Sequence, residues 1–180
     1  MSPDAIAPDT KDWTWVLERP CPDCGFVASD VPADRVAEGV RRLTAPWAQV
    51  LARPDSAQRS QPDRWSALEY GCHVRDVCRV FAGRVRLVLA EDAPQFANWD
   101  QDASATHGRY GEQDPGVVAG QLADDAAGLA AAFEHVPDGQ WGRTATRSDG
   151  SAFTLLTLGQ YGLHDLAHHL WDVGVQRPSL

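Results

Sequence analysis

His164 and His168 lie four residues apart in segment 161–171, whose pattern predicts a helix. On a helix, this spacing places both imidazoles on one face, roughly 5–6 Å apart at Cβ. Imidazole nitrogen is an ordinary ligand of zinc and related divalent ions. The pair could therefore form part of a metal site, and at least one more ligand must come from another segment.

His73 is the predicted third ligand. It lies in a predicted helix over 66–90, on the face that carries Val77 and Phe81, so its ring is expected to point into the core. A histidine on an apolar face is more often an ordinary core residue, but the histidine pair on a later helix favours a ligand. Three imidazoles leave one coordination position open, which is typical of catalytic sites.

An open site of this kind supports a defined chemistry. A bound divalent ion lowers the pKa of the water or thiol that occupies the open position. Zinc suits a site of three histidines best, and nickel, iron and manganese are the alternatives.

The elements that must position these side chains are predicted from hydrophobic periodicity and helix caps. Ser66 with Glu69 matches a capping box, and Asp114 before Pro115 matches a helix start. Four amphipathic helices are predicted, over residues 32–53, 66–90, 115–135 and 154–175. The predicted fold is all-α: a four-helix bundle over 32–176 with long connecting loops, and an N-terminal extension, 1–31, that packs on the bundle.

Segment 93–115 is predicted to be a long irregular loop that forms a lid or a pocket wall, because it is rich in aromatic residues. Trp99, Asp100 and Arg109 are its candidate substrate-binding residues. The alternative, that these three side chains only pack or face solvent, is equally compatible with the sequence. A short hairpin is expected within 141–153.

The N-terminal extension carries two tryptophans and two cysteines. Trp13 and Trp15 are too apolar to lie free in water, so this part is expected to cover a helix or a pocket mouth. Cys21 and Cys24, in the order Cys-Pro-Asp-Cys-Gly, have the form of a zinc knuckle. A structural zinc needs four ligands, and the sequence shows no second Cys-x-x-Cys or matching Cys/His pair, so a turn without metal is expected. A redox dithiol is the alternative, although no thioredoxin-like strand and helix surround it.

Composition excludes several classes of function. The net charge is −9, from 25 acidic and 16 basic residues, and no basic cluster extends beyond Arg41 and Arg42, so nucleic-acid binding is not expected. The apolar runs are too short to span a membrane, and the N-terminus lacks signal-peptide features, so a cytoplasmic protein is expected. In that reducing compartment, Cys72 and Cys78 are predicted to be buried structural thiols.

Two motifs resemble the DinB/YfiT-like family. Segment 65–73, WSALEYGCH, resembles the family's Trp-Ser-x-x-Glu-x-x-x-His signature, and segment 161–169 is similar to its terminal His-x-x-x-His motif. The resemblance covers nearly the whole predicted bundle. It implies a four-helix bundle, often dimeric, that binds a divalent metal through His73, His164 and His168.

The same resemblance implies a class of reaction. Relatives include thiol-dependent S-transferases and mycothiol-dependent maleylpyruvate isomerases. A single lysine among many arginines suggests a GC-rich bacterial genome, so a mycothiol-type thiol is the favoured cosubstrate. We expect the bound metal to activate this thiol for attack on an electrophile held under loop 96–110. The alternatives are a metal-dependent hydrolase, disfavoured by the lack of a glutamate base beside the histidines, and a non-catalytic metal-binding stress-related protein.

Residues close to the predicted ligands are assigned supporting positions. Asp76 and Asp165 are candidate hydrogen-bond partners of the metal-binding histidines, with Asp165 the weaker candidate because it lies off the inner face. His169 is rotated by about 100° from His168 around the helix axis. It is therefore predicted to lie on the surface or in a subunit interface. His107 and His135 are expected to be ordinary loop and helix-end residues.

Overall fold

A computed structural model describes residue 6 and residues 11–180 of the chain. The helices are α1 (Val36–Thr44), α2 (Trp47–Leu51), α3 (Ala67–Ala90), α4 (Gln101–His107), α5 (Pro115–Glu134) and α6 (Leu155–Asp172). The strands are β1 (Gln95–Phe96), β2 (Thr144–Arg147) and β3 (Ala152–Thr154). Single turns of 3-10 helix lie between them, of which η1 (Thr14–Leu17) matters for the site.

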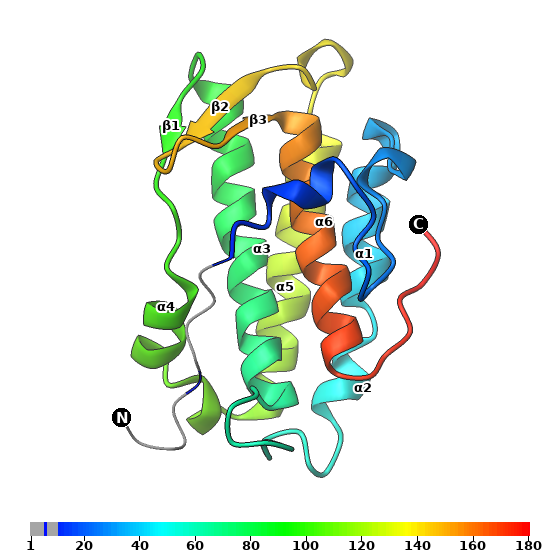
Figure 1. Ribbon diagram of the computed structural model, residues 1–180, viewed down its shortest axis with the longest axis vertical. Helices are drawn as coiled ribbons and strands as arrows, with labels where there is room; N and C mark the ends of the chain where they lie inside the picture. The colour runs from blue at the N-terminus through cyan, green and yellow to red at the C-terminus, as the bar shows by residue number, and fades with distance from the viewer. Residues whose placement is uncertain (1–5, 7–10) are drawn as a thin grey trace.

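The helices α1, α3, α5 and α6 form a bundle. Both α3 and α1 pack on α5 and α6, so the order around the bundle is α1–α5–α3–α6. Figure 1 shows these helices along the long axis of the molecule, with the small sheet across one end. Apolar side chains from every bundle helix form one buried cluster, and each fully buried large side chain contributes about 1.5–3 kcal/mol to stability. The predicted all-α bundle is confirmed.

Three helix starts are fixed by the predicted side chains. The Ser66 hydroxyl accepts from the backbone N–H of Glu69, whose carboxylate accepts from the N–H of Ser66 in return. Asp114 caps α5 before Pro115, and Thr154 caps α6. These caps satisfy N–H groups that have no partner inside the helix, and they confirm the predicted starts.

The predicted first helix is divided in the structure. Its apolar positions are buried as expected, but α1 ends at Thr44 and α2 begins at Trp47. Pro46 lies between them, and a proline has no N–H for the helix ladder. Near the end of α6, Trp171 is 46% exposed.

The segment predicted as a long irregular loop contains regular structure. Strand β1 pairs in parallel with β2, and β2 pairs antiparallel with β3 with Ala145 opposite Phe153. The hairpin expected within 141–153 is thereby confirmed. Between β1 and α5, α4 forms a short helix whose first turn is capped by Asp100. Segment 93–115 is therefore a folded wall beside α3 rather than an irregular lid.

The N-terminal segment crosses the bundle and packs on α6 through η1 (Figure 1). Val16 and Phe26 are buried, and the Gln160 amide on α6 donates to the carbonyl of Val31. The division of the chain into an extension, 1–31, and a bundle, 32–176, stays a prediction. Among the described residues, no helix is long and apolar enough to cross a membrane.

Candidate metal centre

The three predicted metal ligands do not come together in one group. His73 lies with Asp165 and His169, whereas His164 and His168 lie with Cys21 and Cys24. In each of these two sets, the candidate ligand atoms are all within 4.8 Å of one another. We name them the histidine–aspartate group (His73, Asp165, His169) and the cysteine–histidine group (Cys21, Cys24, His164, His168).

The helix geometry of α6 explains the separation. Successive residues are rotated by about 100°, and residues four apart share a face. His164 and His168 therefore face the N-terminal segment, and the pair one residue later, Asp165 and His169, faces α3 and His73. The pair that accompanies His73 in the structure is Asp165 and His169, so the structure does not bring the three predicted histidine ligands together, and their role as ligands stays a prediction.

The Asp165 carboxylate is the centre of the histidine–aspartate group. Its Oδ1 lies 3.3 Å from Nε2 of His73 and 3.5 Å from Nε2 of His169. The two imidazole rings are 4.6 Å apart between centroids and almost perpendicular, at 87°. One carboxylate oxygen and two ring nitrogens thus converge from two helices, which is an arrangement able to hold a divalent ion.

Asp172 orients His169 within this group. The Nδ1 of His169 lies 2.8 Å from Oδ2 of Asp172, one turn further along α6. A carboxylate partner on one ring nitrogen fixes the tautomer and orients the other nitrogen for binding a metal. The prediction that His169 lies on the surface or in an interface is wrong, since its side chain is only 17% exposed and lies against His73.

The charges of the group suit metal binding. Burial lowers the pKa of His73, so its imidazole is neutral at physiological pH. Burial alone would raise the pKa of Asp165, but the neighbouring His73 outweighs this effect and the pKa falls to about 2. A neutral imidazole and an ionised carboxylate are the protonation states that a metal ion requires. The Nδ1 of His73 is buried and has no hydrogen-bond partner among the described residues.

A cavity of about 500 Å³ lies beside the histidine–aspartate group, and Asp165 forms part of its lining. Trp13 and Trp99 are on its walls, and Trp99 also stacks on His73 with the ring centroids 5.3 Å apart. Asp100 also lines the cavity, and its role in substrate binding stays a prediction. Arg109 is not among the lining residues; its side chain is 73% exposed and pairs with Glu112.

Comparisons with known proteins identify the superfamily and solved structures with a similar fold. The family model for the DinB superfamily matches residues 33–173. The chain belongs to the DinB superfamily. A solved structure of YfiT from Bacillus subtilis, described as "a probable metal-dependent hydrolase", aligns with a TM-score of 0.69 at 19% identity, over 79% of this chain and 84% of that one. No curated protein sequence matches the chain.

A second solved structure is that of the mycothiol-dependent maleylpyruvate isomerase. It aligns with this DinB-superfamily chain with a TM-score of 0.60 at 13% identity, over 85% of this chain and 63% of that one. The chain thus spans less than two thirds of the isomerase. At these identities the two likenesses show a shared fold, and they confirm the DinB/YfiT-like bundle expected from the two motifs.

Two buried arginines in this DinB-superfamily chain were not predicted as site residues. Arg84 and Arg147 both line the cavity and are less than a tenth exposed. Arg147 pairs with Asp149, but Arg84 donates to the carbonyl of Ala97 and forms no ion pair with a carboxylate among the described residues. Burial and the nearby Arg147 lower the pKa of Arg84 to about 10. The signal in the sequence was an arginine on the apolar face of the helix that carries His73.

Of the two aspartates expected to support the histidines, one has that position. Asp165, the weaker candidate, contacts His73 directly and is itself a candidate ligand. Asp76 accepts instead from the Tyr110 hydroxyl and from Arg75. Cys72 and Cys78 are fully buried in α3, and burial raises the pKa of both thiols, which confirms them as structural.

Proposed function

We propose that the chain is a metal-dependent enzyme that uses a low-molecular-weight thiol, with the metal held by the histidine–aspartate group. The observation that carries this proposal is the position of Asp165. Its carboxylate lies between two imidazole nitrogens and also lines the large cavity. A metal held there would be next to a space that can take a substrate.

The donor set fits a divalent ion. Two histidines and one carboxylate form the protein part of several catalytic zinc sites, and the same donors also serve iron. We propose zinc, with nickel, iron and manganese as the alternatives. Three protein ligands leave a position for a small molecule, and an ion in such a site lowers the pKa of a bound water or thiol.

The cavity wall suits a thiol that carries sugar-like hydroxyl groups, as mycothiol does. The faces of Trp13 and Trp99 offer flat apolar surfaces, and Asp12, Asp100 and Asp149 line the same cavity. Aromatic faces pack against the apolar side of a sugar ring, and carboxylates accept from its hydroxyls. Both kinds of group are needed because a binding site fixes orientation through a few polar contacts in an otherwise apolar wall.

Arg84 and Arg147 suggest that the second substrate is acidic. A guanidinium binds a carboxylate through two parallel hydrogen bonds, and Arg84 has no carboxylate partner among the described residues. We propose an electrophile with a carboxylate that these arginines orient towards the thiol. Addition would form a carbon–sulfur bond as a carbon–carbon double bond of the electrophile opens, and the proton lost by the thiol would be taken up by the neighbouring carbon. In an isomerisation the same bond would break again and regenerate the thiol.

Calorimetry of the zinc-loaded protein with mycothiol, glutathione and N-acetylcysteine tests this proposal. The wild-type chain should bind mycothiol, and His169→Gln should lose both the ion of the histidine–aspartate group and the thiol affinity. His135→Gln, which changes an exposed histidine at the end of α5, is the matched control and should retain both.

Other outcomes separate the alternatives. Failure of every thiol to bind the metal-loaded protein would overturn the thiol-dependent function. Metal-dependent cleavage of ester or amide substrates would then support a hydrolase, in which the open position serves a water molecule. A metal-loaded protein without either activity would support a binding function. The homodimer expected from the family is part of the same proposal and is checked by light scattering.

A further inference from the structure

The cysteine–histidine group lies outside the proposed active site and begins with a tight loop in the N-terminal segment. The N–H of Gly25 donates to the carbonyl of Cys21 at 3.0 Å, and the N–H of Cys21 donates to the carbonyl of Phe26 at 2.9 Å. Gly25 has a φ of +67°, a conformation that favours glycine. This loop turns both sulfurs in the same direction, towards α6.

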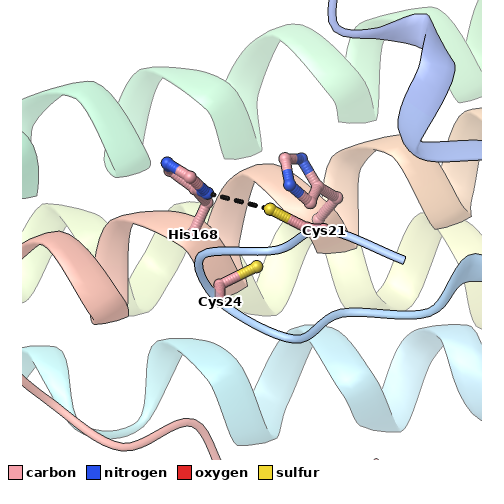
Figure 2. Close-up of side chains that lie close together, drawn as sticks. Cys21, Cys24 and His168 are labelled. Carbon is pink, nitrogen blue, oxygen red and sulfur yellow. Dashed lines mark hydrogen bonds between the residues drawn. The ribbon is translucent and has the colours of Figure 1, made fainter. Parts of the chain in front are cut away.

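The second half of the group comes from α6. The Sγ of Cys21 lies 3.6 Å from Nδ1 of His168, as Figure 2 shows, with Cys24 beside them. One ligand atom from each of the four residues lies within 4.8 Å of every other. Around a tetrahedral zinc with ordinary bond lengths, ligand atoms are separated by roughly 3.4–3.8 Å. The four side chains therefore need only small movements to close on one ion.

Burial gives an independent indication that a ligand is missing. His164 is 4% exposed, and its Nε2 is buried with no hydrogen-bond partner among the described residues. Buried polar atoms are nearly always paired, because an unpaired one costs about 1–3 kcal/mol. Cys21 is 1% exposed. Of the four potential ligands, Cys21 and His164 are thus buried, one of them with an unsatisfied nitrogen, and Cys24 and His168 are partly exposed.

Aromatic rings cover the group. Trp13 packs on His164 and His168 with centroid distances of 5.6 and 5.1 Å, and Phe26 packs on His164 at 5.8 Å. We propose that Cys21, Cys24, His164 and His168 bind a structural zinc ion that fastens the N-terminal segment to α6. Four protein ligands under an aromatic cover leave no position for a substrate, as in structural zinc sites. The expectation of a metal-free turn rested on the lack of a matching pair in the sequence, whereas the structure places His164 and His168 beside the two cysteines.

The proposed structural zinc site is separate from the proposed active site, but it would affect the shape of the substrate cavity. Trp13 lines both the large cavity and a smaller one of about 80 Å³ that also touches His168 and His169. The zinc would therefore hold one wall of the substrate cavity in place without contacting substrate. The C-terminal segment supports the same loop, because Arg177 donates to the carbonyls of Cys24 and Gly25.

Cobalt and zinc titrations of the full-length wild-type protein test the site directly. Bound cobalt should show the sulfur-to-cobalt charge-transfer absorption of thiolate ligands and the intense visible bands of tetrahedral coordination. Zinc should protect Cys21 and Cys24 from alkylation, as mapped by mass spectrometry, and both should become reactive after denaturation with a chelator. Cobalt binding without a thiolate band, or equal alkylation with and without zinc, would overturn the proposal. Recovery of the two cysteines as a disulfide that only a reductant opens would also overturn it.

Variants separate this site from the proposed active site. The double variant Cys21→Ser/Cys24→Ser should abolish the charge-transfer band, whereas Cys78→Ala, which changes a buried thiol in α3, should leave it unchanged. His169→Gln should also retain the band, because the histidine–aspartate group contains no sulfur. If the thiolate band persists in the double variant, the assignment is wrong. If the band behaves as expected but no thiol substrate binds, the structural site stands and the proposed function fails.

Discussion

The two candidate metal groups share α6 but differ in how they are completed. Residues 164 and 168 meet two cysteines from a loop, and residues 165 and 169 meet one histidine from α3. The first group has four potential ligands and lies beneath Trp13 and Phe26. The second has three and borders a cavity of about 500 Å³. The comparison shows that one helix can present two ligand pairs, offset by a single residue, to two different neighbours.

The difference in the number of potential ligands suits one group to a structural role and the other to a catalytic role. A site with four protein ligands contributes its binding energy to folding, whereas a site with an open position can polarise a water or a thiol. The N-terminal segment takes part in both sites. It carries two of the four potential ligands of the cysteine–histidine group, and its Trp13 lines the wall of the cavity.

The largest expected effect is that a substitution in one group removes the metal ion from that group and leaves the ion of the other group bound. Asp165→Ala should remove the ion of the histidine–aspartate group and lower mycothiol affinity at least a hundredfold, on the order of 2.7 kcal/mol, because the central carboxylate is lost. Cys24→Ser should remove only the other ion. Elemental analysis with calorimetry measures both. Simultaneous loss of both ions in Asp165→Ala would show that the groups are not independent.

The next effect is on thermal stability and should be larger for the cysteine–histidine group. At free zinc about a thousandfold above its dissociation constant, binding of one ion to the folded state adds about 4 kcal/mol. For a chain of this size, this amounts to a rise in Tm of roughly 8–16 °C. In calorimetric scans with and without zinc, His169→Gln should keep this rise, and Cys24→Ser should show only the smaller rise that the histidine–aspartate group contributes. An equal rise in both variants would remove the distinction between a structural and an open group.

A smaller effect is expected from the residue that orients His169. Asp172→Asn removes the carboxylate from Nδ1 and should weaken zinc at the histidine–aspartate group by about 10- to 100-fold. The cobalt charge-transfer band of the other group should not change. Asp23→Asn is the matched control, since Asp23 is exposed in the cysteine loop. Competition with a chromophoric chelator measures both affinities, and an equal loss in the two variants would contradict the assigned position of Asp172.

Much of the fold could be predicted because its signals are local. The caps at Ser66, Asp114 and Thr154 and the spacing of apolar residues determined where three of the helices begin. The division of the first helix could have been predicted from Pro46, whose effect on the ladder is also local. Strand β1 within 93–115 depends on pairing with residues about 50 positions further on, as in Gln95 with Thr146, and so was not predicted, whereas the start of α4 at Asp100 is a local signal that the sequence analysis missed.

The candidate site was predicted in its residue types but not in its grouping. Four-residue spacing shows that His164 and His168 share a face, yet it does not show which neighbour that face meets. The rotation of α6 about its axis is set by tertiary packing, and a shift of one residue exchanges His164 and His168 for Asp165 and His169. Because the rotation of α6 could not be predicted, the contact between Cys21 and His168, which are 147 residues apart in the sequence, was not predicted either.

The smallest expected effect concerns the start of α3. This helix carries His73 but no residue of the cysteine–histidine group. Burial alone would raise the pKa of Glu69, but Arg59 and the N–H of Ser66 outweigh it, so the pKa is lowered. A carboxyl whose pKa is lower in the folded state stabilises the protein above its unfolded value of about 4.3. This contribution disappears as the pH falls through the folded pKa.

Glu69→Gln should therefore lower the free energy of unfolding by about 1 kcal/mol at neutral pH, and the difference from wild type should shrink in acid. Denaturant titrations at several pH values measure this difference. Glu134→Gln, which removes an exposed ion pair with Arg41, should have little effect at any pH. Loss of the ion pair between Glu69 and Arg59 and a weaker cap would loosen the turn before His73, so zinc affinity should fall slightly at the histidine–aspartate group alone. A difference that grows in acid would mean that Glu69 is not ionised in the fold.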